Sequence, residues 1–259
     1  MTSQSEKAHN LAALHAAPEI LRVVNVWDAV SAKVIADLPQ TTAIATAGHS
    51  IAATFGYADG ERIPLDVMLD MVARIVAVAG DLPVSADLDA GYGDAAETVR
   101  RAIGVGVVGA NVEDQLRPLH ESVAVVEAII AAGASEGVPF VLNARTDAFL
   151  RGGGRPTAES VADAVERGRA YLDAGATTIF VPGVLDADVT RQLVAGIGER
   201  RVSVIGLPGA LTAAQYEALG VARISYGPMT QRVALTALQD VAIGLYGDEV
   251  IPTSTRSLN

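Results

Sequence analysis

The sequence predicts an α/β fold, a (β/α)8 TIM-type barrel preceded by an extra N-terminal helix. Eight strand-like segments alternate with eight helix-like segments over about 220 residues, which is the repeat of this barrel. The strand-like segments are short and apolar on both faces, as in a buried parallel sheet. The main alternative is an open doubly wound sheet, but no GxGxxG motif follows the first strand to support it. One domain is expected over residues 1–259, with the barrel core at about 20–246.

The elements are expected in a regular order. A helix at Glu6–Ala16 precedes the repeat. The expected strands are Arg22–Val26, Ala43–Ala47, Val84–Asp87, Val108–Glu113, Val141–Arg145, Thr178–Val181, Val202–Ile205 and Arg223–Tyr226. The expected helices are Ala29–Asp37, Leu65–Ala79, Ala95–Gly104, Ser122–Glu136, Ala158–Ala174, Ala187–Gly198, Ala213–Leu219 and Gln231–Tyr246. Capping residues such as Asp94 mark several helix starts, and glycines such as Gly175 mark several ends.

The composition excludes several classes of function. The chain has no cysteine, which excludes disulfides, thiolate–zinc sites and a cysteine nucleophile. Its formal net charge of −11 argues against nucleic acid as a partner, because nucleic acid requires a basic surface. No apolar run has the length of a membrane span, and the N-terminus has no apolar signal core. We therefore expect a cytoplasmic protein that binds no membrane.

One stretch, Val84–Asp94, combines a buried strand, two acids and a glycine turn before a helix start. Asp87 and Asp89 are two residues apart, so an extended backbone would project both side chains to one side. Two carboxylates about 4 Å apart repel by roughly 4 kcal/mol at an effective dielectric of about 20. A proton on one acid or a cation between them would remove this repulsion. The alternative is an acidic helix start capped by Asp94, with Asp89 on a solvated turn.

Other polar residues also gather at the carboxyl ends of the expected strands, where barrels carry their chemistry. Together with Asp87 and Asp89, Glu113 completes an oxygen-only ligand set that suits a hard cation. Mg2+ is the natural candidate, and Mn2+ is the alternative ion. Zn2+ would need His or Cys ligands, and none of the four histidines shows ligand spacing.

Two further pairs, Asn111/Glu113 and Asn143/Arg145, repeat the spacing of the two aspartates on neighbouring strands. Each pair is expected to face one side of its strand. Arg145 is then placed to bind a substrate carboxylate through two parallel hydrogen bonds. The alternative is a set of buried salt bridges in which Arg145 only neutralises Glu113 or Asp87.

Three loop residues give weaker signals. His49 is expected at the mouth of the barrel, although a loop histidine is more often merely solvated. His120 lies in the loop Asp114–Glu121, which is either a moving lid or an ordinary surface loop. Asp59 lies in a long segment after the second strand and either swings over the metal or serves as a turn residue.

These stretches together resemble the isocitrate lyase/phosphoenolpyruvate mutase superfamily. The resemblance runs from about residue 20 to residue 240, and as an ordered set its motifs are highly specific. The matching stretches are Asn25-Val26-Trp27-Asp28-Ala29, Ala45-Thr46-Ala47-Gly48, Phe55-Gly56-Tyr57-Ala58-Asp59-Gly60, Asp87-Leu88-Asp89-Ala90-Gly91-Tyr92-Gly93, Asn111-Val112-Glu113-Asp114, Asn143-Ala144-Arg145-Thr146-Asp147 and Phe180-Val181-Pro182-Gly183.

The resemblance implies a homo-oligomeric barrel, a dimer or a tetramer built as a dimer of dimers, which often swaps a late helix between subunits. It implies Mg2+-dependent chemistry on a small anionic carboxylate, a 2-oxo or 2-hydroxy acid, through a pyruvate enolate. The implied metal positions are Asp87, Asp89 and Glu113, with Asp59 nearby. The implied substrate-binding positions are Trp27, Thr46, Ala47, Gly48, Asp87, Asn111, Asn143 and Arg145. The expected catalytic residues are Asp59, Arg145 and Tyr92, and the proton donor stays open among Tyr92, His49, His120 and water.

Two departures from the superfamily narrow the reaction. Isocitrate and methylisocitrate lyases use a cysteine as general acid, and this chain has none. The phosphonate enzymes carry lysine and asparagine on a lid, and Asp114–Glu121 has neither. The leading hypothesis is a Mg2+-dependent carbon–carbon lyase, a decarboxylase or a retro-aldol enzyme, acting on a small 2-oxo or 2-hydroxy dicarboxylate. The alternatives are P–C chemistry of the phosphoenolpyruvate mutase, phosphonopyruvate hydrolase or carboxyphosphonate phosphorylmutase type, and a non-catalytic carboxylate-binding barrel.

Overall fold

The strands form one parallel sheet that is rolled into a barrel. The computed structural model describes residues 2–258. The strand order is β1-β9-β8-β7-β6-β5-β4-β3-β2, and every neighbouring pair is parallel. The strands are β1 (Leu21–Val23), β2 (Asn25–Val26), β3 (Ile44–Thr46), β4 (Val84–Asp87), β5 (Gly109–Glu113), β6 (Val141–Arg145), β7 (Thr178–Phe180), β8 (Val202–Ile205) and β9 (Arg223–Ser225).

The two edge strands of this sheet, β1 and β2, belong to one segment of chain and are separated only by Val24. β1 pairs with β9, and β2 pairs with β3, so the segment closes the ring. The predicted (β/α)8 barrel is thus confirmed, although its first strand, expected to be continuous over Arg22–Val26, is divided between two partners. Strand closure of this kind brings all carboxyl ends to one rim of the barrel.

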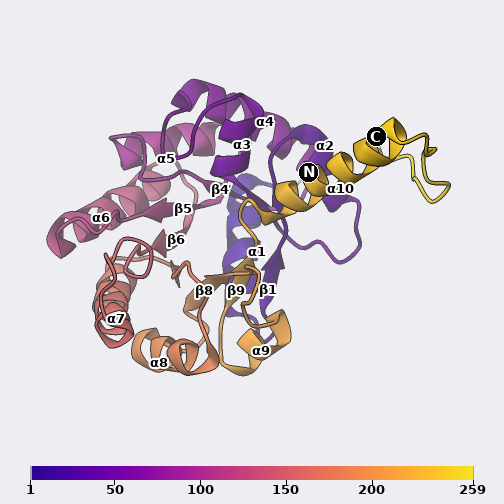
Figure 1. Cartoon of the computed structure of the whole chain (residues 1–259). Helices are drawn as coiled ribbons and strands as arrows, with labels where there is room; N and C mark the ends of the chain where they lie inside the picture. The colour runs from indigo at the N-terminus through magenta and orange to yellow at the C-terminus, as the bar shows by residue number, and fades with distance from the viewer. Residues whose placement is uncertain (1, 259) are drawn as a thin grey trace.

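Helices surround the strands as a ring (Figure 1). They are α1 (Gln4–Ala16), α2 (Ala29–Ala36), α3 (Gly48–Thr54), α4 (Leu65–Ala79), α5 (Ala95–Gly104), α6 (Leu119–Ser135), α7 (Thr157–Asp173), α8 (Ala187–Ile197), α9 (Ala213–Ala218) and α10 (Met229–Tyr246). Side-chain caps fix several starts: Asp28, Asp94, Asp186 and Thr212 each accept a hydrogen bond from a backbone N–H of the first turn. No helix within residues 2–258 is long and apolar enough to cross a membrane.

The extra N-terminal helix α1 lies under the barrel, at the amino ends of the strands. Its Leu11 packs so close to the start of β5 that a Cβ on Gly109 would lie 2.9 Å from Leu11 Cδ2. Gln4 donates hydrogen bonds to the carbonyl oxygens of Ile103 and Val107, at 2.8 and 2.9 Å. The amino end of the barrel is therefore covered, which leaves the carboxyl end for a site.

Most helix ends lie within two residues of the sequence prediction, but one helix was not predicted and another begins three residues early. The structure contains α3 directly after β3, where no helix was expected; its N-cap residue Ala47 has no side chain that could signal a start. α6 begins at Leu119 rather than Ser122, so His120 lies in its first turn and the expected lid loop is shortened. Asp114, in this loop, is buried, and its carboxylate accepts hydrogen bonds from Leu116 N, Asp147 N and Tyr171 Oη. These hydrogen bonds fix the loop around Asp114 against the barrel.

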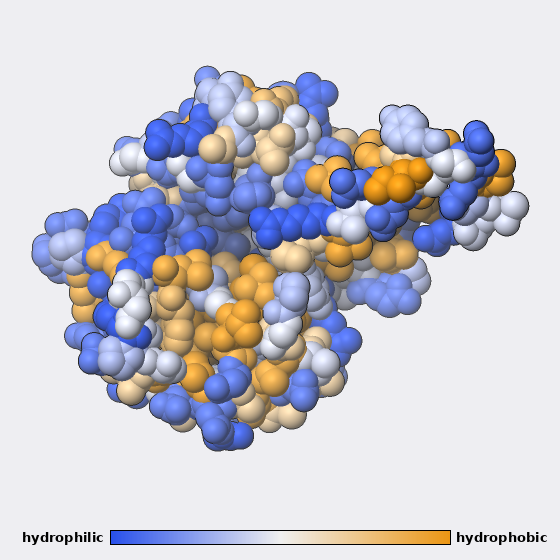
Figure 2. All heavy atoms as spheres, in the orientation of Figure 1, coloured by the Kyte–Doolittle hydropathy of each residue, from blue (hydrophilic) through white to orange (hydrophobic). Residues whose placement is uncertain are grey.

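The last helix, α10, leaves the ring instead of packing against it (Figure 1). Its first turn is attached: Thr230 Oγ1 donates to Asn25 O at 2.7 Å, and Gln231 is buried. From Arg232 onward the helix is exposed, including Val233 at 67% and Leu238 at 64%. In Figure 2 hydrophobic residues are visible along this projecting arm. A free-standing helix with exposed apolar residues signals an interaction surface.

Candidate active site

A polar cavity of about 260 Å³ opens at the carboxyl ends of the strands. Its walls come from nearly every part of the rim, as expected for a barrel site. The lining residues are Asn25, His49, Asp59, Gly60, Asp87, Asp89, Asn111, Glu113, Arg145, Leu150, Arg151, Phe180, Pro182, Ile205, Ser225, Gly227 and Pro228. Among them are four carboxylates and two arginines, so this cavity is the candidate active site.

A larger cavity, of about 510 Å³, lies between α2 and the start of α10. It is almost wholly apolar, contains none of the clustered acids and is lined in part by Val30, Val34 and Val233. Trp27, expected to bind substrate, lines this apolar groove and not the polar cavity. Sequence alone could not fix the direction of the indole, since it depends on how the chain enters α2.

Asp87 is fixed at the end of β4 by its backbone and by its carboxylate. Its N–H donates to Thr46 Oγ1 at 3.0 Å, and its Oδ2 accepts the N–H of Gly48 at 3.0 Å. A Cβ on residue 48 would lie 3.2 Å from the same Oδ2, so the absence of a side chain permits this close approach. Thr46 therefore fixes the backbone of Asp87, and Gly48 holds its carboxylate.

Asp89 reaches the same cavity by a different backbone route from the one predicted. β4 ends at Asp87, and Asp89 has the left-handed conformation with φ of 49°, so no extended strand joins the two acids. Its Oδ2 accepts the N–H of Glu61 at 3.3 Å, and Glu61 Oε1 in turn accepts the N–H groups of Ala90 and Tyr92. The loop after α3 thus holds the turn that carries Asp89.

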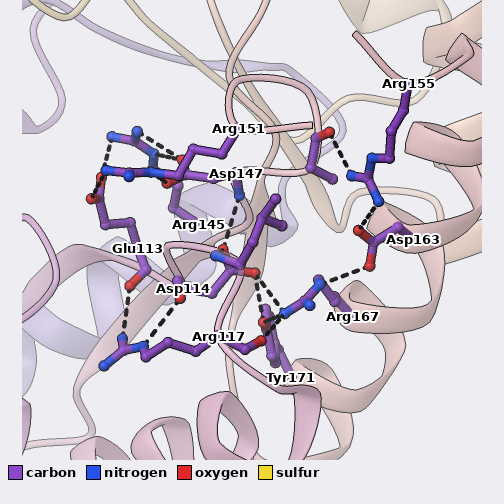
Figure 3. A network of polar contacts seen from close by, with 12 residues as sticks. Glu113, Asp114, Arg117, Arg145, Asp147, Arg151, Arg155, Asp163, Arg167 and Tyr171 are labelled. Carbon is purple, nitrogen blue, oxygen red and sulfur yellow. Dashed lines mark hydrogen bonds and ion pairs between the residues drawn. The ribbon is translucent and has the colours of Figure 1, made fainter. Parts of the chain in front are cut away.

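Glu113 and Arg145 face each other from neighbouring strands (Figure 3). They are paired in register on β5 and β6, and Arg145 Nη1 lies 2.8 Å from Glu113 Oε2. Arg145 also donates from Nε to Oδ1 of Asp147 at 2.8 Å. Glu113 and Asp147 are both buried, whereas Arg145 is 22% exposed to the cavity. The salt bridge named as the alternative to substrate binding does form, yet Arg145 keeps a face toward the cavity.

The clustered acids hold their protons more tightly than isolated carboxylates. Burial, followed by the charges of Asp87, Asp59 and Glu113, raises the pKa of Asp89 to about 8. Burial also raises the pKa of Asp87, although Arg145 and the N–H of Gly48 oppose this. The pKa of Glu113 is raised mainly by burial, and Arg145 opposes it. A cation in this cavity would favour the charged carboxylates, against their burial and against the smaller repulsion between them.

The metal-free protein is expected to lose stability as the pH rises from 4 toward 8. The pKa of Asp89 is raised on folding from 3.8 to about 8, so between these values the folded state keeps a proton that the unfolded state has released. The free energy of unfolding then falls with increasing pH. Melting temperatures in EDTA at about pH 5 and about pH 8 would measure this.

Two comparisons isolate the contribution of Asp89. Saturating Mg2+ should reduce the loss of melting temperature at the higher pH, because the ion compensates the carboxylate charge. An Asp89→Asn variant should show a flatter pH dependence than the unsubstituted protein in EDTA. Equal slopes for the two proteins would contradict the assignment of the shift to Asp89.

The two asparagines predicted to bind substrate lie at different depths. Asn111 lines the cavity, whereas Asn143 is fully buried beneath it. Asn143 Nδ2 donates to Asn111 Oδ1 at 2.8 Å and to Ser203 Oγ at 3.2 Å, and its Oδ1 accepts from Thr178 Oγ1 at 2.8 Å. Asn143 thus orients Asn111 from below.

The backbone N–H groups expected to bind a carboxylate already have partners. The N–H of Ala47 donates to Val26 O at 3.0 Å, within the barrel, and that of Gly48 donates to Asp87. Thr46 is buried, and its hydroxyl accepts from Asp87 N. In this arrangement Thr46 and Gly48 position Asp87, and Ala47 is part of the strand pairing.

The candidate proton donors differ in their access to the cavity. His49 lines it from the first turn of α3, and its Nδ1 lies 3.3 Å from Oδ2 of Asp59 in the loop that follows, so both residues reach the rim. The hydroxyl of Tyr92 is buried and has no hydrogen-bond partner among residues 2–258, and Tyr92 does not line the cavity. Burial, with the nearby charges of Asp89 and Glu61, raises the pKa of Tyr92. His120 also lies outside the lining.

Two polar residues of the cavity had no role assigned to them from the sequence. Arg151 lines the wall from the glycine-rich loop after β6. Asn25 connects the ends of β9 and β3: its Oδ1 accepts hydrogen bonds from the N–H groups of Tyr226 and Gly227, and its Nδ2 donates to Thr46 O. The position of Asn25 at the end of a strand was a usable signal, because the same position identified Asp87.

The donor set suits a hard cation in its chemistry, since Asp87, Asp89 and Glu113 offer only oxygen. Within residues 2–258 no three or more acidic or histidine side chains are clustered closely enough to form a ready ligand set. Glu113 instead points at Arg145. Mg2+ is commonly held by one or two carboxylates with water and substrate, which this arrangement permits.

Comparison with known proteins agrees with this fold. The family model for phosphoenolpyruvate phosphomutase matches residues 11–246. An oxaloacetate decarboxylase from Chromohalobacter salexigens is 30% identical over 92% of this chain and 85% of its own. A 2,3-dimethylmalate lyase from Eubacterium barkeri is 30% identical over 86% of this chain and 80% of its own.

A solved structure of a candidate phosphonomutase from Burkholderia cenocepacia superimposes with a TM-score of 0.86 at 35% identity. The match covers 93% of this chain and 99% of the other. The family model covers most of the chain, and the barrel is shared with this solved structure. The chain belongs to the phosphoenolpyruvate phosphomutase family, within the isocitrate lyase/phosphoenolpyruvate mutase superfamily.

Proposed function

We propose that the protein is a Mg2+-dependent carbon–carbon lyase acting on a small 2-oxo or 2-hydroxy dicarboxylic acid. The observation that carries this proposal is the cavity in which Asp87, Asp89 and Glu113 lie beside Arg145, in a chain without cysteine. The names of two relatives, oxaloacetate decarboxylase and 2,3-dimethylmalate lyase, denote the cleavage of such acids, which supports the proposal.

Asp87, Asp89 and Glu113 are the residues that would hold the ion, with Mn2+ as a substitute for Mg2+. A bound divalent cation would supply Lewis-acid stabilisation of negative charge that develops on the 2-oxo oxygen. Asp59, which lies on the rim of the cavity, would face the bound ion. The raised pKa values of Asp87 and Asp89 support this role, because the cluster favours a positive charge.

Arg145 would bind a carboxylate of the substrate and stabilise the enolate as it forms. For a 2-oxo acid, the electron pair of the breaking carbon–carbon bond would move to the 2-oxo oxygen as CO2 leaves, or as an aldehyde or ketone leaves after its hydroxyl has given its proton to a base such as Asp59. For a 2-hydroxy acid, the 2-hydroxyl would give its proton to such a base and become the carbonyl of the 2-oxo product, and the electron pair would move into the carboxylate of the leaving fragment. The guanidinium faces the cavity and is held rigidly by Glu113 and Asp147, so little reorganisation is needed as charge develops.

The enolate must then be protonated on carbon. His49 supports this role best among the candidates, because it lines the cavity and is oriented by Asp59. Asp59 would assist the proton transfer indirectly, through its contact with His49. Tyr92 would not donate this proton. It would instead influence the ionisation of Asp89, whose charge lies close to it.

The test is pyruvate release from a panel of 2-oxo and 2-hydroxy dicarboxylates, measured with Mg2+ and with EDTA. We expect turnover of at least one acid in Mg2+ and its loss in EDTA. Turnover that persists without a divalent ion, or no turnover with any carbon–carbon substrate, would contradict the proposal.

P–C chemistry is the second candidate, favoured by the family model and by the Burkholderia structure. Phosphorus NMR of phosphonopyruvate or phosphoenolpyruvate incubated with the protein decides it, and an unchanged spectrum excludes it. A non-catalytic barrel would bind oxalate with Mg2+ and turn over nothing. Oxalate resembles the enolate, so its failure to bind would count against the site itself.

We also propose a cytoplasmic homo-oligomer, a dimer or tetramer, in which α10 of one subunit packs on another. The apolar groove between α2 and α10 and the exposed Val233 and Leu238 support this assembly. Trp27 would then lie at the subunit contact.

Replacing Val233 and Leu238 together by Asp is expected to shift the protein to a smaller species, because it places charge on the exposed apolar helix. Light scattering coupled to size exclusion measures the mass. The control is Gln239→Asp, a charge introduced at a polar position of the same helix, which should leave the mass unchanged. A smaller species with the control, or none with the double variant, would contradict this packing.

A further inference from the structure

We infer that Arg151 is a specificity-determining residue that binds the second carboxylate of a dicarboxylic substrate. This inference rests on the proposed function and deepens it, because it assigns a binding group to the end of the substrate remote from the reacting oxygen. It concerns a residue that the sequence placed only in a glycine-rich loop.

Arg151 combines exposure with a fixed position. Its side chain is 53% exposed and lines the polar cavity together with Arg145. Nε donates to Oδ2 of Asp147 at 2.9 Å, and Nη2 lies 3.6 Å from Oε1 of Glu113. Among residues 2–258 its Nη1 has no hydrogen-bond partner. Donors on the guanidinium are therefore open to an anion in the cavity.

The buried Asp147 holds two arginines as a pair (Figure 3). Its Oδ1 accepts from Arg145 Nε and its Oδ2 accepts from Arg151 Nε, at 2.8 and 2.9 Å. Asp147 is itself fixed, since its N–H donates to Asp114 Oδ1 at 3.0 Å. Two guanidinium groups held on one carboxylate are pre-organised, which lowers the entropy lost on binding a ligand. Such a pair is suited to a ligand with two anionic groups.

The charge of the cavity points the same way. Asp59, Asp87, Asp89 and Glu113 line it with Arg145 and Arg151, and both arginines contact the buried Asp147. These five acids, two arginines and a divalent cation have a formal charge of −1, and loss of Arg151 would make it −2 and increase the repulsion of a dianion. A substrate with one carboxylate has less need of the second arginine than a dicarboxylate has.

The competing explanation is that Arg151 only clamps its loop against Asp147. Arg155 offers a matched control on the same loop: its guanidinium donates to Asp163 Oδ2 and Ala148 O, and it does not line the cavity. If the loop clamp were the whole role, substitutions at the two positions would have similar effects on ligands.

The experiment compares ligands with and without a remote carboxylate. Binding of malate, lactate and oxalate in the presence of Mg2+ is measured by calorimetry for the unsubstituted protein, Arg151→Gln, Arg151→Lys and Arg155→Gln. Oxalate tests the metal and enolate position, and lactate is malate without its second carboxylate.

We expect Arg151→Gln to weaken malate binding by about 10- to 100-fold, the effect of losing charge-assisted hydrogen bonds. Oxalate and lactate should change by less than about threefold, and Arg151→Lys should recover part of the malate affinity because it keeps the charge without the fork. Arg155→Gln should leave all ratios unchanged. The preference for malate over lactate is the quantity that decides.

The outcomes separate this inference from the proposed function. If oxalate binds but Arg151→Gln leaves the malate-to-lactate preference unchanged, the inference is overturned and the proposed function stands. The inference is also overturned if Arg155→Gln reduces the preference as much, or if the unsubstituted protein does not prefer malate. If oxalate does not bind to the unsubstituted protein, both the proposed function and the inference fail.

Discussion

An Asp87→Ala variant is expected to lose Mg2+ binding while keeping its fold. Asp87 ends β4, lines the polar cavity and is positioned by Thr46 and Gly48. Loss of an outer-sphere partner alone typically costs 10–100-fold in metal affinity, so loss of a proposed direct ligand should exceed about 100-fold. The kcat/KM for the preferred acid should fall with it. Calorimetric titration with Mg2+ and the pyruvate assay measure the two effects.

The fold should survive because the acid cluster repels itself in the absence of an ion. Removing Asp87 takes away one of the charges that raise the pKa of Asp89, which should move back toward its ordinary value. The control is Asp94→Ala, since Asp94 caps α5 by accepting the N–H of Glu97 at 3.0 Å. That variant should lose about 1 kcal/mol of stability and keep its Mg2+ affinity. An Asp87→Ala protein that binds Mg2+ normally would remove Asp87 from the site.

The barrel was predictable from sequence because its strands are buried on both faces. Runs such as Val141–Arg145 read as short, mainly apolar strands that end in a polar residue, and that pattern placed Asp87, Glu113 and Arg145 at one rim. The spacing to Asp87 also predicted Asp89, and Asp59 was a weaker loop candidate that the family resemblance supported; both line the cavity. The strand pattern was sufficient to predict these rim residues because closure of the sheet leaves each strand little choice of neighbours.

What escaped prediction depends on contacts between distant segments. α3 has no capping side chain at its start, so nothing local distinguishes it from a loop. Arg151 is brought to the cavity by Asp147 and not by its own strand. The apolar periodicity of α10 reads the same whether the helix packs on its own barrel or on another subunit, so only the family resemblance, with its swapped late helix, suggested that α10 would leave the barrel.

Replacing Arg145 by Met is expected to reduce kcat by about 100- to 1,000-fold, the usual cost of one donor to a developing oxyanion. It should also destabilise the protein. Burial alone would lower the pKa of Arg145, but the carboxylates of Glu113 and Asp147 raise it, so the guanidinium stays charged between them. Breaking a buried pair typically costs 3–5 kcal/mol, because the acids are left without their counter-charge.

Arg145→Lys separates catalysis from stability. Lysine keeps the positive charge beside Glu113 and Asp147, so most of the melting temperature should return relative to Arg145→Met. It lacks the planar fork that binds a carboxylate through two parallel hydrogen bonds, so the turnover defect should remain. Urea unfolding and steady-state kinetics on both variants measure the two properties. If the lysine variant recovered kcat as well as stability, only the charge of Arg145 would matter, and its proposed grip on the substrate would be wrong. If it recovered neither, the ion pairs with Glu113 and Asp147 would require the fork as much as the substrate does.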